Sequence, residues 1–443
     1  MGHDRLNTKG ARVTDARYAK SEAQLERARR VIPLGAQTFS KSITQFPFGA
    51  SPYFAAKAKG SRLWDVDGNE YADFINALCS VTLGYADEDV NGAVEKQLKD
   101  GTIFSLSHAL EAECAERIVR LVPCAEKVRF GKNGSDATAG AVRIARAATG
   151  RDRVLVCGYH GWQDWYIGST ARNAGVPQAT RDLTHSFAYD DLPALAALLD
   201  AHEGEVACVI LEPMNVRFPS KGYLEGVQRL TRDAGAVLVF DETITGFRYA
   251  RGGAQALFGV TPDLCTLGKG IANGFPLSAV AGRADLMAFM EEVFFSFTMG
   301  GETLSLAAAC ATLDKLDREP VVETMAARGK DVMAGAEALL EKHGLSHAIS
   351  LAGHPSWSFL MMTDQPGATS FELKTLFLQE VFARGALTLG THNMSYAHTP
   401  ADVADLMSAY DGAFAVMARA LSDGGVAPYL RCEPLQPLFK VRG

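Results

Sequence analysis

Short apolar runs alternate with longer segments of helical periodicity along the middle of the chain, from about residue 86 to residue 310. These short runs are rich in β-forming residues, are mostly apolar, and cover residues 127–130, 153–157, 206–211 and 236–240. Continuous apolar strands separated by helices are typical of a parallel sheet that is buried on both faces. The pattern therefore predicts an α/β fold built on a large, mainly parallel sheet.

The two ends of the chain show a different pattern. Alternating polar and apolar residues around Asp67-Gly68 predict a β-hairpin within residues 60–74. After residue 310, a long helical stretch is followed by mixed strands and helices, which predicts a smaller α+β domain. The elements expected here are a helix at 21–31, helical structure over 306–343, a strand at 356–362, and helices at 370–384 and 400–422.

Composition and charge narrow the class of protein. The chain has 443 residues, 47% hydrophobic and 21% charged, with a net charge of −7. Such an acidic chain lacks the basic footprint of a nucleic-acid-binding protein, and its apolar runs are too short to span a bilayer. The polar first thirty residues do not resemble a secretion signal. We therefore expect a cytoplasmic protein without nucleic-acid or membrane partners.

The eight cysteines and ten histidines do not form a metal-binding pattern. No two cysteines have C-x-x-C spacing, and their apolar surroundings are typical of small core residues in a reducing compartment. His343 and His347 have H-x-x-x-H spacing, but Gly344 is expected to end the helix between them, so their rings need not share a face. We therefore expect no metal site.

A carboxylate and a lysine stand where polar groups follow buried strands. Asp241 comes directly after the apolar run 236–240, and Lys269 lies further along between two glycines. Each signal alone is more often an ion pair, a helix cap or a solvated lysine in a turn. Together they match pyridoxal phosphate, which needs an amine for a Schiff base and a carboxylate to keep its ring nitrogen protonated. A partly desolvated lysine is also a usable nucleophile and proton shuttle.

Two further polar clusters lie where such a cofactor needs them. Gly134 and Ser135 follow a strand and open a helical pattern, so they offer backbone N–H groups and a hydroxyl to a phosphate. An ordinary helix cap formed by Ser135 or Asp136 explains the same residues equally well. Tyr159 follows another strand with His160 beside it, and its ring suits stacking on a pyridine ring, although such a pair is more often structural.

At this point the chain resembles the class III aminotransferases of the fold-type-I pyridoxal-phosphate enzymes, nearest to the glutamate-1-semialdehyde aminomutase branch, over about residues 25–420. The most specific stretch, Val239-Phe-Asp-Glu-Thr-Ile-Thr-Gly-Phe-Arg248, is similar to the family's F-D-E-V-x-T-G-F-R. It is followed by Pro262-Asp263 and by Leu267-Gly-Lys-Gly-Ile-Ala-Asn-Gly-Phe-Pro276. The resemblance implies a large domain with a mainly parallel seven-stranded sheet and a smaller α+β domain.

We accordingly expect three parts. They are an N-terminal segment 1–60 that contributes to the small domain and to an interface, a large pyridoxal-phosphate-binding domain 61–310, and a C-terminal small α+β domain 311–443. The resemblance also implies a homodimer whose active sites lie at the interface. Its partners would be a small-molecule amino donor and a carbonyl acceptor.

The resemblance implies a role for each cluster around pyridoxal 5'-phosphate. Lys269 would be the Schiff-base lysine and proton shuttle, and Asp241 would pair with the pyridine nitrogen. The remaining cofactor contacts would be Tyr159 and Thr243 on the two faces of the ring, Gly134 and Ser135 at the phosphate, Glu212 near the cofactor, and Thr298 from the neighbouring subunit.

Several positions differ from the aminomutase pattern, and these differences indicate which residues contact the substrate. Glu302 replaces a neutral amide, Lys41 replaces a substrate-binding arginine, and His392-Asn393 replaces a segment whose glutamate contacts substrate. The expected substrate contacts are therefore Lys41, His160, Glu302, His392 and Asn393. A structural alternative for Glu302 is an ion pair with a nearby basic residue. Lys132, which is new in the phosphate turn, is expected to be solvated.

These departures favour transfer of an amino group between two molecules over exchange within one. The expected function is a pyridoxal-phosphate-dependent aminotransferase with a ping-pong mechanism and a keto or aldehyde acceptor, such as a sugar or nonulosonate. The alternative is a glutamate-1-semialdehyde-type 2,1-aminomutase. A more remote alternative is a non-catalytic protein that only binds the cofactor.

Overall fold

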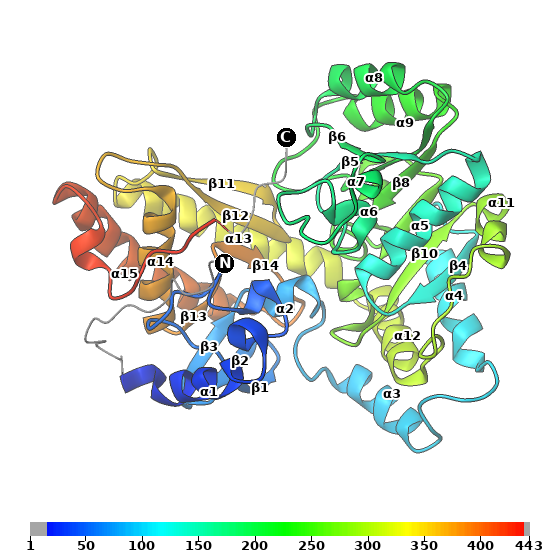
Figure 1. Cartoon of the computed structure of the whole chain (residues 1–443). Coiled ribbons are helices and arrows are strands. Elements are labelled where there is room, and N and C mark those ends of the chain that lie inside the picture. Colours follow the sequence, from blue (N-terminus) through cyan, green and yellow to red (C-terminus); the bar gives the residue numbers. More distant parts are fainter. Residues whose placement is uncertain (1–15, 438–443) are drawn as a thin grey trace.

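A computed structural model describes residues 16–437 (Figure 1). The large domain, on the right of Figure 1, is built on a seven-stranded sheet in the order β4-β10-β9-β8-β7-β5-β6. β10 is antiparallel to β4 and β9, and the adjacent strands from β9 to β6 are parallel. The strands are β4 (Lys127–Gly131), β5 (Arg153–Cys157), β6 (Thr184–Ser186), β7 (Val206–Leu211), β8 (Val237–Asp241), β9 (Leu264–Leu267) and β10 (Ser278–Gly282).

Both faces of this sheet are buried. Along β5, Val154 and Val156 pack on one face with residues of α5 (Gly134–Thr149). Leu155 and Cys157 belong to the core on the opposite face, which includes residues of α9 (Tyr223–Asp233). Because successive side chains of a strand point to opposite faces, every residue of such a strand must be apolar. The predicted α/β fold with a large, mainly parallel sheet is confirmed.

Helices and short turns connect the strands of the large domain. The helix α5 shows why they begin where they do: the side chains of Asn133 and Asp136 form a capping box, and Gly150 ends the helix with a φ of 65°. The other connecting elements are α2 (Asn76–Cys79), α3 (Glu88–Leu98), α4 (Ala109–Leu121), α6 (Asp164–Ile167), α7 (Gln178–Arg181), α8 (Leu192–Ala201), α10 (Gly253–Phe258), η4 (Lys269–Ala272), α11 (Ala284–Met287), η5 (Ala288–Glu291) and α12 (Thr303–Arg318).

Two smaller sheets form the second domain, on the left of Figure 1. One has the order β1-β2-β3-β13, and the other has the order β11-β12-β14. Their strands are β1 (Ala55–Lys59), β2 (Arg62–Asp65), β3 (Glu70–Asp73), β11 (Ile349–His354), β12 (Trp357–Met362), β13 (Ala386–Leu387) and β14 (Thr391–Asn393). The accompanying helices are η1 (Ala16–Tyr18), α1 (Ala19–Arg29), η2 (Pro33–Gly35), η3 (Phe39–Lys41), α13 (Val321–Lys342), α14 (Ser370–Ala383), α15 (Pro400–Ser422) and η6 (Ala427–Tyr429).

The predicted hairpin belongs to this second domain. β2 and β3 pair in antiparallel fashion, and Gly68 in the turn has a φ of 92°, which favours glycine. β13 then pairs with β3 in parallel, so residues 62–73 share a sheet with residues 386–387. The expected boundary at residue 60 therefore falls between β1 and β2 of a single sheet.

A buried arginine joins the two domains. The guanidinium of Arg248, which is 1% exposed, donates to the carbonyl oxygens of Ser356 at 3.2 Å and Met394 at 2.6 Å. It also donates to the carbonyl of Cys79 at 3.2 Å, at the end of α2. A buried cation is tolerated when hydrogen-bond acceptors replace its water. Arg248 thus fixes the segment after β8 against the small domain.

The short element α2 is a left-handed turn. All four of its residues have positive φ values, between 44° and 69°. This conformation costs roughly 1–2 kcal/mol for each residue with a side chain, so tertiary contacts must hold it. The backbone N–H groups of Ile75 and Asn76 donate to Asp73 Oδ1 at 2.7 and 3.1 Å, and Asn393 Nδ2 donates to the carbonyl of Ile75 at 2.7 Å.

Within residues 16–437, no helix combines the length and the apolar composition that a bilayer crossing requires. The same described residues contain no group of three or more His, Cys, Asp or Glu side chains arranged to hold a metal ion. His343 instead lies 2.7 Å from Asp411 Oδ1, and the eight cysteines are free.

Replacing Arg248 should destabilise the fold strongly. We expect Arg248→Ala to cost about 3–5 kcal/mol, because three buried carbonyl groups lose a charged donor. The matched control is Arg251→Ala, whose side chain is 44% exposed and which should change stability by no more than about 0.5 kcal/mol. Thermal and urea unfolding of both variants measure the difference, and equal stabilities would contradict the domain-joining role of Arg248.

Candidate active site

Several charged side chains lie at the carboxyl ends of the central strands. Asp241 is the last residue of β8 and is 4% exposed. Its Oδ1 accepts hydrogen bonds from the N–H of Thr243 at 3.1 Å and from Thr266 Oγ1 at 2.9 Å, and its Oδ2 lies 2.8 Å from His160 Nδ1. Burial acts to raise the pKa of Asp241, but these donors and the charge of His160 outweigh it and hold the pKa below its usual value. Asp241 is therefore a buried, ionised carboxylate.

His160 is a buried neighbour of Asp241. Its side chain has no exposed surface, and its second ring nitrogen, Nε2, lies 3.2 Å from the carbonyl oxygen of Cys157. Both nitrogens are thus occupied by protein atoms. The sequence predicted His160 as a substrate contact, but in the structure its side chain is fully buried and both ring nitrogens face protein atoms.

Lys269 follows β9, next to the strand that carries Asp241. Its backbone has a φ of 43°, a left-handed conformation that is rare for a residue with a side chain. Among the described residues its amine has no hydrogen-bond partner. Burial lowers the pKa of Lys269, although Cys79, Glu212 and Asp241 act in the opposite sense. The amine is thereby more nucleophilic near neutral pH than a solvated lysine.

Glu212 and Tyr159 follow the next two strands. Glu212 comes after β7, and its Oε2 accepts hydrogen bonds from the N–H of Tyr159 at 3.0 Å and from Asn215 Nδ2 at 2.8 Å. Burial and the nearby Asp241 raise the pKa of Glu212. A Cβ at Gly158 would lie 2.5 Å from Glu212 Oε2, so only glycine fits there. Glu212 therefore orients the backbone that carries Tyr159, whose ring is half exposed and meets Tyr166 edge-on at 5.6 Å.

A cradle for an anion lies at the start of α5. A Cβ on Gly134 would come within 3.0 Å of Thr243 Cγ2, and a Cβ on Gly268 would lie 3.8 Å from the Cα of Gly134. Ser135 Oγ, beside them, accepts a hydrogen bond from the N–H of Trp162 at 3.2 Å. Thr243 Oγ1 is buried and has no hydrogen-bond partner among the described residues. A helix N-terminus with an unsatisfied hydroxyl beside it is a suitable site for a phosphate group.

These features together decide the family. The family model of the class III aminotransferases matches residues 47–392 of this chain. The protein belongs to the class III aminotransferases. It is 32% identical to the 3-aminobutyryl-CoA aminotransferase of Cloacimonas acidaminovorans over 415 residues, which cover 91% of this chain and 99% of the relative.

Solved structures agree with this assignment. The FumI protein of Sphingopyxis sp. MTA144, in its PLP internal aldimine form, aligns with a TM-score of 0.86 and 30% identity over 93% of this chain and 99% of that one. A glutamate-1-semialdehyde aminomutase from Pseudomonas aeruginosa PAO1 aligns with a TM-score of 0.78 and 24% identity over 89% and 94% of the two chains. At this lower identity the aminomutase shares the fold, which is that of the fold-type-I pyridoxal-phosphate transferases.

Class III aminotransferases use pyridoxal phosphate, and the residues of this site fit that cofactor. Lys269 would offer its amine, Asp241 would offer a buried anion to the ring nitrogen, and Gly134 with Thr243 would cradle the phosphate. When bound, the cofactor supplies the electron sink that stabilises the carbanion of an amine substrate. The Lys269 amine, which has no hydrogen-bond partner among the described residues, would be the group of this chain that accepts and returns a proton.

Glu302 has a structural role in this aminotransferase. Its carboxylate caps α12 by accepting from the N–H groups of Leu304 and Ser305, and it lies 2.9 Å from Lys132 Nζ. Burial acts to raise the pKa of Glu302, but hydrogen bonds from Ser305 and Lys132 outweigh it and lower the pKa. The ion pair with a basic residue, which was the structural alternative, is the arrangement found. It also means that Lys132 is paired and not simply solvated.

The histidine and asparagine expected near the substrate lie in the core of the small domain. His392 is fully buried between Ser358 Oγ and Tyr410 Oη, at 2.8 and 2.7 Å, and burial lowers its pKa to about 3. Asn393 supports the left-handed turn α2. The structure therefore buries both residues in the small domain, where their side chains are not exposed. Lys41 lies exposed at the end of η3.

Three functional features had no separate signal in the sequence. Thr266 lies inside the apolar strand β9, where a threonine is an ordinary β residue, yet its hydroxyl donates to Asp241. Arg248 ends the most specific motif, and only its three carbonyl partners reveal what it does. The left-handed turn α2 contains no glycine, so nothing in its composition indicated it.

Removing the lysine amine should abolish covalent attachment of the cofactor. Borohydride reduction is expected to fix the cofactor to Lys269 in the wild type and to leave Lys269→Ala without it, as read by peptide mass spectrometry. Amine transfer should fall by about 10²- to 10⁴-fold, because the proton shuttle is lost. Lys132→Ala is the matched control and should keep the label, whereas labelling of the Lys269→Ala chain at another lysine would contradict the assignment.

The lowered pKa of Lys269 has a kinetic consequence for the cofactor-free protein. Only the neutral amine attacks a carbonyl, so the rate of covalent capture should rise with pH and level off at the pKa of Lys269. We expect this plateau below pH ~10.4, the ordinary lysine value, because burial disfavours the charged amine. Stopped-flow absorbance over a pH series measures it, and a rate still rising at pH ~10.4 would contradict the shift.

Proposed function

We propose that this aminotransferase moves an amino group between two separate molecules in a ping-pong cycle, from an amine donor to a keto or aldehyde acceptor. The observation that carries the proposal is the free, partly buried amine of Lys269 beside the ionised Asp241. A lysine in this state can withdraw a proton from a bound amine and return it at another carbon. Membership of an aminotransferase family also tells against the non-catalytic alternative.

We propose further that one substrate carries its amine on a carbon that bears no carboxylate. The relative at 32% identity is named for 3-aminobutyryl-CoA, a substrate whose amine is on C3 and whose carboxyl group is a thioester. In this chain, the arginine whose charge acts on Lys269 is Arg248, and its guanidinium is buried against three carbonyl groups. Arg248 is therefore not available to grip a substrate carboxylate beside the reacting carbon.

The sugar or nonulosonate acceptor is a second candidate for the carbonyl substrate. The sequence motifs that favour this acceptor contain His160, Glu302 and His392. The polar atoms of these three side chains contact other residues of the chain. A hydroxylated acceptor would therefore need other donors. A panel that contains both β-keto thioesters and keto sugars compares the two acceptor classes directly.

Separate half-reactions test the proposal. Enzyme loaded with pyridoxal phosphate is mixed with one amine at a time, the carbonyl product is counted, and an acceptor is then added after removal of the donor. We expect one equivalent of carbonyl product per active site, followed by one equivalent of aminated acceptor. Full conversion of a single amino aldehyde without an acceptor would instead identify an aminomutase.

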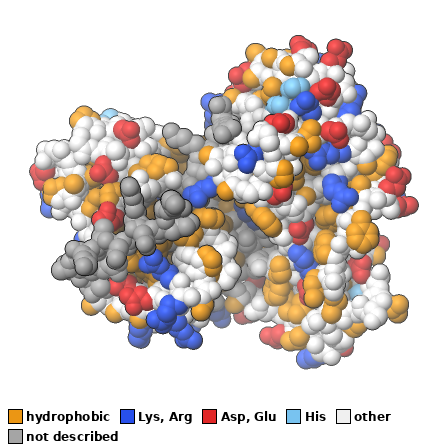
Figure 2. Space-filling model, in the orientation of Figure 1, with side chains coloured by type: hydrophobic (Ala, Val, Ile, Leu, Met, Phe, Trp, Pro, Cys, Tyr) orange, Lys and Arg blue, Asp and Glu red, His pale blue; other side chains and the backbone are white. Residues whose placement is uncertain are grey.

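We also propose that the catalytic unit is a homodimer. Leu106, Phe294 and Met299 are 84%, 81% and 53% exposed, and they lie on two adjoining segments because the N–H of Thr303 donates to the carbonyl of Thr102 at 2.9 Å. Large exposed apolar side chains that adjoin one another are typical of a protein interface. Hydrophobic side chains are visible over the large domain in Figure 2.

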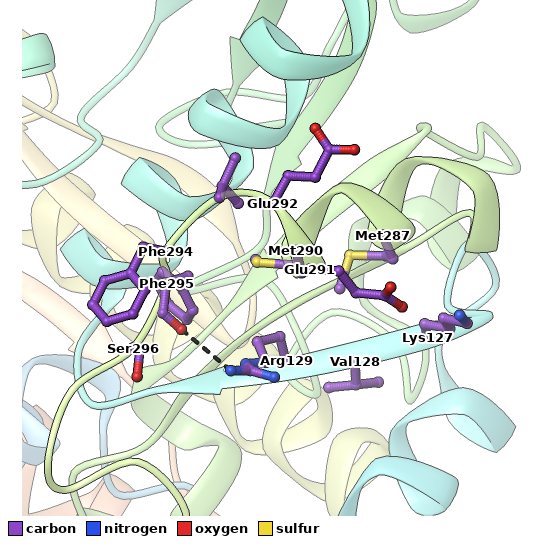
Figure 3. Close-up of a pocket in the computed structure, with 11 residues that line it drawn as sticks. Lys127, Val128, Arg129, Met287, Met290, Glu291, Glu292, Phe294, Phe295 and Ser296 are labelled. Atoms are coloured by element: carbon purple, nitrogen blue, oxygen red, sulfur yellow. Dashed lines mark hydrogen bonds between the residues drawn. The ribbon is translucent and has the colours of Figure 1, made fainter.

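The pocket drawn in Figure 3 adjoins this surface. It has a volume of about 550 Å³ and lies between the edge strand β4 and the segment 287–296. Phe294 and Phe295 stand at one end of it, and Arg129 donates to the carbonyl of Phe295 at 3.4 Å. Thr298 lies exposed in the turn that follows, without a hydrogen bond among the described residues. This position supports a role for Thr298 in the partner's phosphate site.

Mixing two defective subunits tests the dimer. Thr298→Ala should weaken cofactor binding by about 10- to 100-fold through loss of a hydrogen bond to a charged group, and Lys269→Ala lacks the amine. A heterodimer of the two contains one intact site if Thr298 acts across the interface. At limiting cofactor, a refolded 1:1 mixture should then recover about a quarter of wild-type activity. No recovery, with heterodimers present by light scattering and native mass spectrometry, would show that Thr298 does not act on the partner's site.

A further inference from the structure

We propose that Tyr249 determines substrate specificity by donating a hydrogen bond to an uncharged carbonyl oxygen of the substrate. This inference rests on the proposed function, because such an oxygen belongs to an acyl group like a thioester. Tyr249 is 4% exposed, and its hydroxyl is buried without a hydrogen-bond partner among the described residues. A buried hydroxyl without a partner costs free energy that phenylalanine at the same position would avoid. A substrate atom that accepts its hydrogen removes this cost.

The hydroxyl of Tyr249 lies among groups that also surround Lys269. Besides burial, three groups act on the pKa of both side chains, namely Cys79, Glu212 and Arg248. Cys79 packs with Tyr249 in one buried cluster. The carbonyl oxygen of Cys79 would also lie 3.6 Å from a Cβ at Gly270, the residue after Lys269. A substrate held at the Lys269 amine would therefore extend toward Tyr249.

The fold holds the ring of Tyr249 in place. The ring lies 4.2 Å from that of His354, at the end of β11, with an angle of 33° between the two planes. His354 is itself fixed, because its Nδ1 accepts a hydrogen bond from the N–H of Ser356 at 3.1 Å. The backbone N–H of Tyr249 donates to the carbonyl of Thr245 at 3.2 Å. Tyr249 thus lies where the segment after β8 meets the small domain.

The surroundings of Tyr249 favour an uncharged acceptor over a carboxylate. The other buried members of its cluster are Cys79, Met214, Ala254 and Trp357. In such mostly apolar surroundings a carboxylate loses its water at a high cost unless charged donors replace it. Arg248, the cation that acts on Tyr249, already donates to three backbone carbonyls. Burial raises the pKa of Tyr249, so the phenol keeps its hydrogen and can donate it to a carbonyl oxygen.

Two amine donors test this role on wild-type and Tyr249→Phe enzyme loaded with pyridoxal phosphate. One is a thioester of 3-aminobutanoic acid, and the other is sec-butylamine, which has the same carbons next to the amine but no carbonyl. In the donor half-reaction, Tyr249→Phe should raise the half-saturating concentration of the thioester by about 3- to 10-fold, because one neutral hydrogen bond is lost. The maximal rate should stay the same, since that bond holds substrate and transition state alike. Both enzymes should convert sec-butylamine equally well.

Unfolding measurements separate this role from a structural one. Tyr249→Phe should unfold at the same urea concentration as the wild type or at a higher one, since it removes only an unpartnered hydroxyl. The matched control is Tyr410→Phe, because the hydroxyl of Tyr410 lies 2.7 Å from His392 Nε2 in the small domain. Tyr410→Phe should lose stability and keep wild-type kinetics with both donors.

The possible outcomes distinguish this inference from the proposed function. If the wild type converts the thioester and Tyr249→Phe is saturated at the same concentration, the role of Tyr249 is wrong and the proposed function stands. Equal losses with both donors would also overturn it, because the ring would then shape the site without binding a carbonyl. A wild type that converts sec-butylamine but never the thioester would overturn the proposed substrate class and this inference with it.

Discussion

The buried cation of Arg248 is the contact on which the geometry of this protein depends. A guanidinium in a dry interior is stable only when acceptors replace its water, and here three backbone carbonyls from distant parts of the chain do so. Two of them belong to the small domain, and the third ends the left-handed turn α2. Because Arg248 also follows β8 in the chain, it links the strand that carries Asp241 to the small domain.

The strand ends show how similar groups acquire different states. Asp241 and Glu212 are both buried carboxyl groups at the same edge of the sheet, yet the pKa of Asp241 is lowered and that of Glu212 is raised. The difference comes from their partners, since Asp241 is bound by His160, Thr243 and Thr266, whereas Glu212 holds a backbone N–H and an amide. Asp241 is therefore held in its ionised form, whereas Glu212 fixes the backbone at Tyr159.

Most of the polar residues that distinguish this chain from aminomutases make structural contacts within the chain. Glu302 caps a helix, His392 fills the small-domain core and Asn393 holds α2. Each of these three side chains makes hydrogen bonds to other residues of the chain. The left-handed turn that Asn393 supports ends at Cys79, which acts to raise the pKa of Lys269 against the effect of burial. A framework residue can thus influence the site by fixing the backbone beside the reactive amine.

The sequence by itself determined the α/β architecture, the strands near residues 153–157, 206–211 and 236–240, and the choice of Asp241 and Lys269 as candidate cofactor residues. These are short-range properties, because continuous apolar runs define buried strands, and polar groups directly after them must lie at one edge of a parallel sheet. Only the tertiary structure decided which way the polar side chains turn. His160 meets Asp241, and Asn393 meets Ile75, across long separations in the chain. Such pairings depend on which segments the fold brings together, and no local pattern records them.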